Sequence, residues 1–184
     1  VWNLQAIAEA KRRQVRDLTA IVLDRPRHAH IISDVRSTGA RVRLITDGDL
    51  MAAIATADDS TGIDVLFGAG GAPEGVLAAA ALRSMGGDMQ GMFQPEDTAQ
   101  ADEVLERTRR SLDHAYRIEE LARGDVMFAA TGVTTGPVFR GVTFLEDGGA
   151  EVHSLVTRSA TGSVRWVRKR MSSTQVLGIL VGKR

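Results

Sequence analysis

Residues 63–85 read IDVLFGAGGAPEGVLAAAALRSM, and they are the clearest guide to the fold class. The short apolar run at residues 63–67 predicts a buried strand, and the glycine-rich residues 68–71 predict a turn. Pro73 suits the first turn of a helix, which we expect to run to about Met85 before a pair of glycines stops it. A strand that leads through a glycine-rich turn into a helix is typical of parallel α/β folds.

The same order of strand and helix repeats on the N-terminal side of this stretch. We expect strands at residues 18–23 and 42–46, and helices at residues 26–38 and 49–57. Short apolar strands joined by helices usually pair in parallel, with helices on both faces. The pattern therefore predicts the α/β fold class, with a sheet that is mainly parallel.

The beginning of the chain predicts an amphipathic helix. Its apolar face would carry Trp2, Leu4, Ile7, Ala8 and Val15, with charged side chains on the opposite face. No capping residue and no polar lead-in precede this helix, so we expect that sequence upstream of the first residue is missing.

The pattern changes in the C-terminal part of the chain. Residues 96–123 are polar and charged at helical spacing, which predicts one or two surface helices. Residues 125–130 predict a further strand, and the alternation between residues 141 and 170 predicts a terminal antiparallel meander. We divide the chain into a domain at residues 1–170 and a tail of uncertain structure at residues 171–184.

Composition narrows the class of protein. The 184 residues include no cysteine, which excludes a disulfide framework, a thiolate metal site and a cysteine nucleophile and fits a cytoplasmic setting. The formal net charge is zero, whereas a nucleic-acid binder is expected to be basic. No apolar run approaches the roughly 20 residues that span a bilayer. We therefore expect neither a nucleic acid nor a membrane as partner.

The charges are unevenly distributed along the chain. Residues 46–106 hold twelve acidic side chains and one basic, while the segments on both sides hold a basic excess. This distribution fits either solvated helix faces or a site where basic groups hold an anion and carboxylates hold a cation. Composition alone does not distinguish these two interpretations.

The first candidate site segment follows the strand at residues 18–23. Arg25, Pro26 and Arg27 place two guanidinium groups at a predicted helix start, where free backbone N–H groups favour anions. The alternative is a solvated, basic helix terminus. His28 and His30 could ligate a metal, but surface or capping roles are the better interpretation.

Two more segments follow the next two strands. Asp47, Gly48 and Asp49 place two carboxylates where they could accept hydrogen bonds from hydroxyl groups or approach a cation, although one Asp could simply cap the helix. The glycine-rich turn ending at Gly71 would let backbone N–H groups approach a phosphate, and Glu74 stands beside it as a candidate ligand for Mg²⁺ or Mn²⁺. A dipole-compensating Glu is the alternative. The turn is no Walker A loop, because Val and Leu stand where Lys and Ser or Thr are required.

Six segments stand together in the order and spacing of a known family. They are LDRPRH at 23–28, GARVRLITDGD at 39–49, GAGGAPEGVLAAAA at 68–81, GGDMQG at 86–91, AATGVT at 129–134 and HSLVTRS at 153–159. Over about residues 1–168 the chain resembles the class II, GlpX-type, bacterial fructose-1,6-bisphosphatases. They belong to the lithium-sensitive phosphatases, whose fold stacks helices and sheets in alternating layers.

The resemblance implies an activity and roles for individual residues. The family hydrolyses the 1-phosphate of fructose 1,6-bisphosphate in gluconeogenesis, with Mg²⁺ or Mn²⁺ as cofactor. Some cyanobacterial members also accept sedoheptulose 1,7-bisphosphate. By resemblance, the substrate-binding residues would be Arg25, Pro26, Arg27, Asp47, Gly48, Asp49 and Gly71, and the metal ligand would be Glu74.

The chain also departs from the family. The family's other acidic metal ligands, and a threonine that helps to position the attacking water, lie in an N-terminal half that has no counterpart here. We therefore expect the C-terminal half of such an enzyme, without catalytic residues of its own and inactive in isolation. Its expected partners are the N-terminal half, a sugar bisphosphate and further copies of itself. The alternatives are a non-catalytic sugar-phosphate- or nucleotide-binding module, and an assembly piece that uses residues 96–123.

Overall fold

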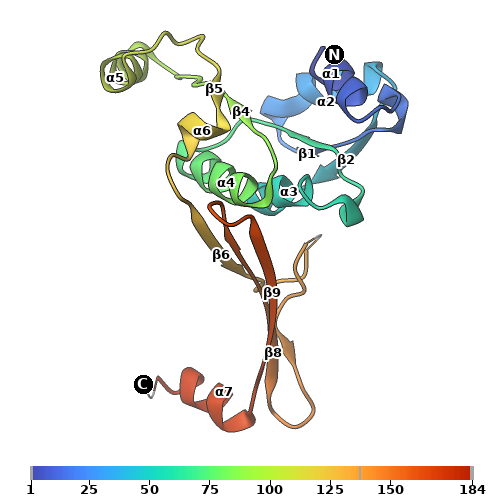
Figure 1. Ribbon diagram of the computed structural model, residues 1–184, viewed down its shortest axis with the longest axis vertical. Coiled ribbons are helices and arrows are strands. Elements are labelled where there is room, and N and C mark those ends of the chain that lie inside the picture. The colour runs from blue at the N-terminus through green and yellow to red at the C-terminus, as the bar shows by residue number, and fades with distance from the viewer. Residues whose placement is uncertain (1, 137, 183–184) are drawn as a thin grey trace.

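Figure 1 shows the computed structural model, which describes residues 2–136 and 138–182. Its helices are α1 (Trp2–Ala10), α2 (Ala29–Ser37), α3 (Asp49–Ala55), α4 (Ala72–Met85), α5 (Thr98–Thr108), α6 (Ile118–Leu121) and α7 (Ser173–Leu180). Its strands are β1 (Thr19–Leu23), β2 (Arg41–Ile45), β3 (Val65–Phe67), β4 (Gln90–Gly91), β5 (Tyr116–Arg117), β6 (Met127–Thr131), β7 (Thr143–Phe144), β8 (Ala150–Arg158) and β9 (Ser163–Met171). Short 3₁₀ turns lie at Val15–Asp17, Pro26–His28 and Asp59–Thr61.

The parallel sheet that the sequence predicts is present and has three strands. β1 lies between β2 and β3, and both pairings are parallel. The register places Leu23 beside Ile45 and Val22 beside Phe67. All three strands therefore end at the same edge of the sheet.

Helices cover both faces of this sheet, as the predicted fold class requires (Figure 1). α1 and α2 lie on one face, where Leu4 and Val35 pack against Ala20. α3 lies on the other face, where Ala52 packs against Ile21. Each helix presents small or branched apolar residues to the sheet, so the helices approach it closely.

A second, antiparallel sheet lies on the far side of α3 and α4 (Figure 1). Ile54 of α3 and Ala81 of α4 pack against Phe128 and Leu155 of this sheet. The helical layer is therefore buried between two sheets, which gives the alternating layers predicted from the sequence.

β8 is the central strand of the antiparallel sheet. β9 pairs along its whole length, while β6 and β7 pair with different parts of it. The predicted antiparallel strands are confirmed between residues 141 and 170. β6 pairs with β8 and not with β7, which is its neighbour in sequence. The sheet as a whole is therefore not a meander, in which each strand pairs with the next one along the chain.

The apolar face predicted for the first helix is wrong in part, and the two helices predicted at residues 96–123 differ from each other in burial. Trp2 is 74% exposed, because residues two apart on a helix point to opposite sides and Leu4 and Ala8 take the buried side. Within residues 96–123, Ile118 packs on α4, whereas Leu105 on α5 is 41% exposed. The polar segment therefore forms one docked and one exposed helix.

The tail that the sequence left unassigned contains α7. Ser172 begins this helix, and its side chain accepts a hydrogen bond from the backbone N–H of Gln175 over 3.4 Å. α7 follows β9 and lies at the open end of the β8–β9 hairpin, away from the helical layer (Figure 1). Among the described residues, no helix has the length and apolar character needed to cross a membrane.

Candidate functional site

The predicted site residues follow the carboxyl ends of the three parallel strands. The turn Pro26–His28 follows β1, residues 46–48 follow β2, and residues 68–71 follow β3. Because the three strands end at one edge, the three segments meet there. Ligands of open parallel sheets bind at this edge.

Arg27 joins the first segment to the glycine-rich turn. Its Nε donates a hydrogen bond to the carbonyl oxygen of Ala69 over 3.1 Å. Within the described chain, no residue engages its two terminal nitrogens, which form a planar fork suited to an anion. Arg25 is also exposed, and Pro26 begins the 3₁₀ turn, where its fixed φ is favourable.

The aspartate segment reaches the glycine-rich turn through Asp49. The Oδ2 atom of Asp49 lies 3.5 Å from the position that a Cβ would take at Gly70. Asp47 is exposed at the same edge. The expectation that one of the aspartates is the N-cap of α3 is wrong, because the N-cap is Gly48, with φ of +87°. Oδ1 of Asp49, the first residue of the helix, accepts a hydrogen bond from the backbone N–H of Leu50 over 2.9 Å.

Glu74 lies in the first turn of α4 and folds back over the turn before it. Its carboxylate occupies the space that a side chain at Gly71 would need. Gly71 is the N-cap of α4 and has an ordinary φ of −64°, so its backbone does not require glycine, and a side chain there would have to displace only the flexible end of Glu74. A carboxylate beside free N–H groups also compensates the helix dipole.

His28 is the residue of this edge that sequence reasoning missed. A surface or capping role was expected. His28 does occupy the N-cap position of α2, but its side chain makes no capping bond and is fully buried. Its Nδ1 lies 2.9 Å from the carbonyl oxygen of Leu23, and the backbone N–H of Ala69 donates to its Nε2 over 2.9 Å. The signal available in the sequence was its place directly after a buried strand and a helix-starting proline.

The acidic residues do not form a complete metal site. The described residues contain no cluster of three or more His, Asp or Glu side chains arranged to hold a metal ion. Glu74 offers oxygen donors of the kind that Mg²⁺ and Mn²⁺ take, but one carboxylate is too few. The remaining ligands of a hydrolytic centre would have to come from outside these residues.

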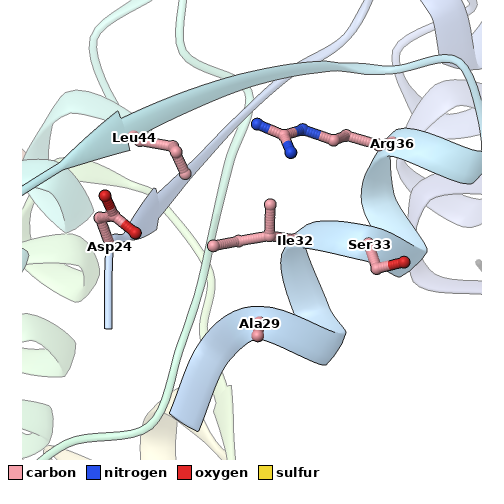
Figure 2. Close-up of a pocket in the computed structure, with 6 residues that line it drawn as sticks. All are labelled: Asp24, Ala29, Ile32, Ser33, Arg36 and Leu44. Carbon is pink, nitrogen blue, oxygen red and sulfur yellow. The ribbon is translucent and has the colours of Figure 1, made fainter. Parts of the chain in front are cut away.

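A shallow hollow of about 350 Å³ lies next to the site, between α2 and β2 (Figure 2). Figure 2 shows Ile32 pointing into it, with Leu44 and Arg36 above and Asp24 at its side. Asp24 immediately precedes Arg25, so the hollow adjoins the basic turn. None of the predicted substrate-binding residues lines it.

Comparison with known proteins gives one family. The model of the family described as bacterial fructose-1,6-bisphosphatase, glpX-encoded, matches residues 1–171. The match includes all three segments at the edge of the parallel sheet.

Individual relatives agree with this result. A protein of Synechococcus sp. (strain JA-3-3Ab), named D-fructose 1,6-bisphosphatase class 2/sedoheptulose 1,7-bisphosphatase, is 48% identical over 179 residues. Proteins of the same name from Synechococcus sp. (strain JA-2-3B'a(2-13)) and Trichodesmium erythraeum (strain IMS101) are 47% and 44% identical. Each alignment covers 90% of this chain and 51% of the relative. The chain therefore spans about half the length of the curated relatives it matches.

Proposed function

Because the chain belongs to the family of bacterial, glpX-encoded fructose-1,6-bisphosphatases, we propose that it forms the substrate-binding half of such an enzyme. The enzyme would hydrolyse the 1-phosphate of fructose 1,6-bisphosphate and release fructose 6-phosphate. The observation that supports this most is the meeting of Arg27, Asp49 and Glu74 around one glycine-rich turn. Basic, hydroxyl-binding and cation-binding groups then surround a single position.

Each segment would bind a different part of a sugar bisphosphate. Arg25 and Arg27, with Pro26 setting the turn, would bind phosphate oxygens through their planar forks. Asp47 and Asp49, on either side of Gly48, would accept hydrogen bonds from sugar hydroxyls. Gly71 would contact the substrate through its backbone. Together these contacts hold the reacting phosphate in place, and positioning of this kind lowers a reaction barrier by several kcal/mol.

The metal requirement explains why this chain needs a second part. Glu74 would be one ligand of Mg²⁺ or Mn²⁺, and the other carboxylates would come from an N-terminal half of the complete enzyme. A divalent cation bound there would activate water and offset charge on the leaving oxygen. The chain alone would hold substrate groups in place without turning the substrate over.

A bifunctional enzyme is the second candidate. The three relatives are named for both fructose 1,6-bisphosphate and sedoheptulose 1,7-bisphosphate. Their identity of 44–48% makes this the nearest alternative. Comparison of kcat/KM for the two bisphosphates would distinguish the two candidates.

The setting of the enzyme follows from the same proposal. We place it in the cytoplasm, in gluconeogenesis, as a homo-oligomer. Exposed apolar side chains on α7, among them Ile179 and Leu180 at 67% and 72%, support self-association. Light scattering of the complete protein would measure the number of copies.

Phosphate release from fructose 1,6-bisphosphate tests the proposal. The chain joined to the N-terminal half of a relative should release phosphate with Mg²⁺ or Mn²⁺ and stop on addition of EDTA. Glu74→Ala should abolish metal-dependent release. Glu106→Ala, which removes an exposed carboxylate on α5, is the matched control and should leave the rate unchanged. Equal rates in both variants would reject Glu74 as a ligand.

The basic turn has its own test. Arg25→Ala and Arg27→Ala should each raise KM about tenfold or more, because a charge-assisted hydrogen bond is lost. Arg43→Ala, on the exposed part of β2, removes the same charge outside the site. An unaltered KM in both site variants would show that the basic turn does not bind the substrate.

A further inference from the structure

The buried imidazole of His28 has one arrangement of protons that fits its surroundings. The carbonyl oxygen of Leu23 can only accept, so Nδ1 must carry a hydrogen and donate it over 2.9 Å. The backbone N–H of Ala69 can only donate, so Nε2 must be free of hydrogen and accept over 2.9 Å. Both conditions select the neutral ring protonated at Nδ1.

The contacts of Arg27 agree with this arrangement. Nε2 of His28 also lies 3.1 Å from the carbonyl oxygen of Ala69 and, without a hydrogen, makes no bond there. Arg27 supplies the missing donor, because its Nε donates to that same oxygen. The two consecutive side chains thus satisfy both backbone groups of Ala69, one each.

The two hydrogen bonds of His28 differ in importance. The carbonyl oxygen of Leu23 also accepts from the backbone N–H of Arg25 over 2.9 Å, so it keeps a partner without His28. Among the described residues, the N–H of Ala69 has His28 as its acceptor and no other. The imidazole also lies beside Gly68, because a Cβ added at that residue would lie 3.5 Å from Cε1. The contact with Ala69 is therefore the one that holds the glycine-rich turn.

We propose that His28 is a positioning residue that, together with Arg27, fixes Ala69 and so holds the glycine-rich turn in the shape that binds substrate phosphate. The inference rests on the proposed function, whose site it deepens. A turn with glycine at positions 68, 70 and 71 has many conformations, and selecting one of them in advance lowers the entropy lost on binding. The buried ring supplies this selection without touching the substrate.

Two substitutions separate the two hydrogen bonds. The amide of Asn reaches about as far as Nδ1 of histidine, whereas the amide of Gln reaches about as far as Nε2. His28→Gln can therefore keep an acceptor for the Ala69 N–H, while His28→Asn can keep a donor for Leu23. His28→Phe fills the ring space with neither bond and controls for packing.

The first measurement uses the 184-residue chain and needs no activity. Nitrogen-15 NMR of the imidazole should show His28 neutral and protonated at Nδ1. Hydrogen exchange at the Ala69 amide should be slow in the wild type and in His28→Gln. It should be at least about tenfold faster in His28→Asn and His28→Phe, with the amides of β1 unchanged. Protonation at Nε2, or equal exchange in all three variants, would overturn the proposal.

The second measurement uses the complete protein. His28→Gln should keep KM for fructose 1,6-bisphosphate within about twofold, while His28→Asn and His28→Phe should raise it about tenfold, the loss expected for one hydrogen bond. A fall in kcat alone, or the same KM in the Gln and Asn variants, would reject a role in substrate binding. If the wild type releases no phosphate, the proposed function fails, while the exchange data still decide whether His28 holds Ala69.

Discussion

Asp64 is the residue that joins the beginning of the chain to the parallel sheet. Its carboxylate accepts hydrogen bonds from Lys11 over 2.9 Å, from Arg13 over 2.8 Å and from the backbone N–H of Thr19 over 2.8 Å. Its side chain is 4% exposed. These bonds connect the segment after α1 and the start of β1 to the residue that precedes β3.

The stability of the protein should depend on the charge of Asp64. Burial raises the pKa of this carboxyl, but the hydrogen bonds of Lys11 and Thr19 and the charge of Arg13 hold its pKa below the ordinary value. A lowered pKa in the folded state stabilises the fold above the unfolded pKa of about 3.9. This contribution should disappear as the pH falls through the folded pKa.

Asp64→Asn should therefore lower the free energy of unfolding by about 2 kcal/mol at pH 7, the value typical of hydrogen bonds to a charged group. Urea unfolding at pH 7 and at pH 3 measures this, and the difference from wild type should shrink at the lower pH. Asp34→Asn on the exposed side of α2 is the control and should change stability by less than about 0.5 kcal/mol. A loss that is equal at both pH values would show that charge is not the cause.

Two glycines at the site should respond oppositely to alanine. Gly48 has a φ of +87° with open space around it, so Gly48→Ala strains the backbone and should cost about 1 kcal/mol of stability. Gly71 has an ordinary φ, so Gly71→Ala should leave stability nearly unchanged while its methyl group displaces the Glu74 carboxylate. Thermal unfolding measures the first effect, and metal-dependent phosphate release measures the second. Full activity in Gly71→Ala would contradict the placement of Glu74.

At the scale of elements, α4 connects the candidate site with α3 and the antiparallel sheet. Its first turn carries Glu74 at the site, and its later turns pack against both α3 and the antiparallel sheet. A polar contact fixes it there, because the hydroxyl groups of Ser84 on α4 and Thr157 on β8 are buried and hydrogen-bonded to each other. Ser84 also donates to the carbonyl oxygen of Ala81 over 2.8 Å.

Removal of one of these hydroxyl groups should cost more than removal of both. Ser84→Ala leaves the Thr157 hydroxyl buried without its partner and should cost about 1–3 kcal/mol. Addition of Thr157→Val should recover a substantial part of the loss, because an apolar group of similar shape needs no partner. Urea unfolding of the two single variants and the double variant tests this. Ser37→Ala, at an exposed position of α2, is the control. Strictly additive losses would contradict the prediction.

At the scale of the whole molecule, the site is an open edge and not a closed pocket. Arg25, Asp47 and Glu74 are all exposed at the carboxyl edge of the parallel sheet. Under the proposed function, a second half of the enzyme would cover this edge.

Separate halves should therefore recover activity when mixed. The 184-residue chain alone should release no phosphate from fructose 1,6-bisphosphate with Mg²⁺ or Mn²⁺. Addition of the N-terminal half of a relative should restore metal-dependent release, since it would supply the missing ligands. Activity of the chain alone would show that the described residues suffice. If the two halves associate tightly but release no phosphate, the proposed reaction is wrong.

Much of the fold was predictable because it rests on local pattern. The strands of the parallel sheet and α2, α3 and α4 begin and end within a few residues of their predicted positions, since buried strands are short and apolar and since proline and glycine mark the helix ends. Trp2 and the strands β4 and β5 were not predictable in the same way. A two-residue strand has no periodicity, and the face that a helix buries depends on what it meets.

The sequence by itself determined the order of the elements, their division into parallel and antiparallel parts, and the residue types that follow each parallel strand. Those properties depend on neighbours in the chain. Only the tertiary structure decided that His28 is buried against Ala69, 41 residues away, that Glu74 folds over Gly71, and that the acidic side chains form no complete metal site. Such features depend on how segments distant in sequence pack in three dimensions, which residue pattern alone does not specify.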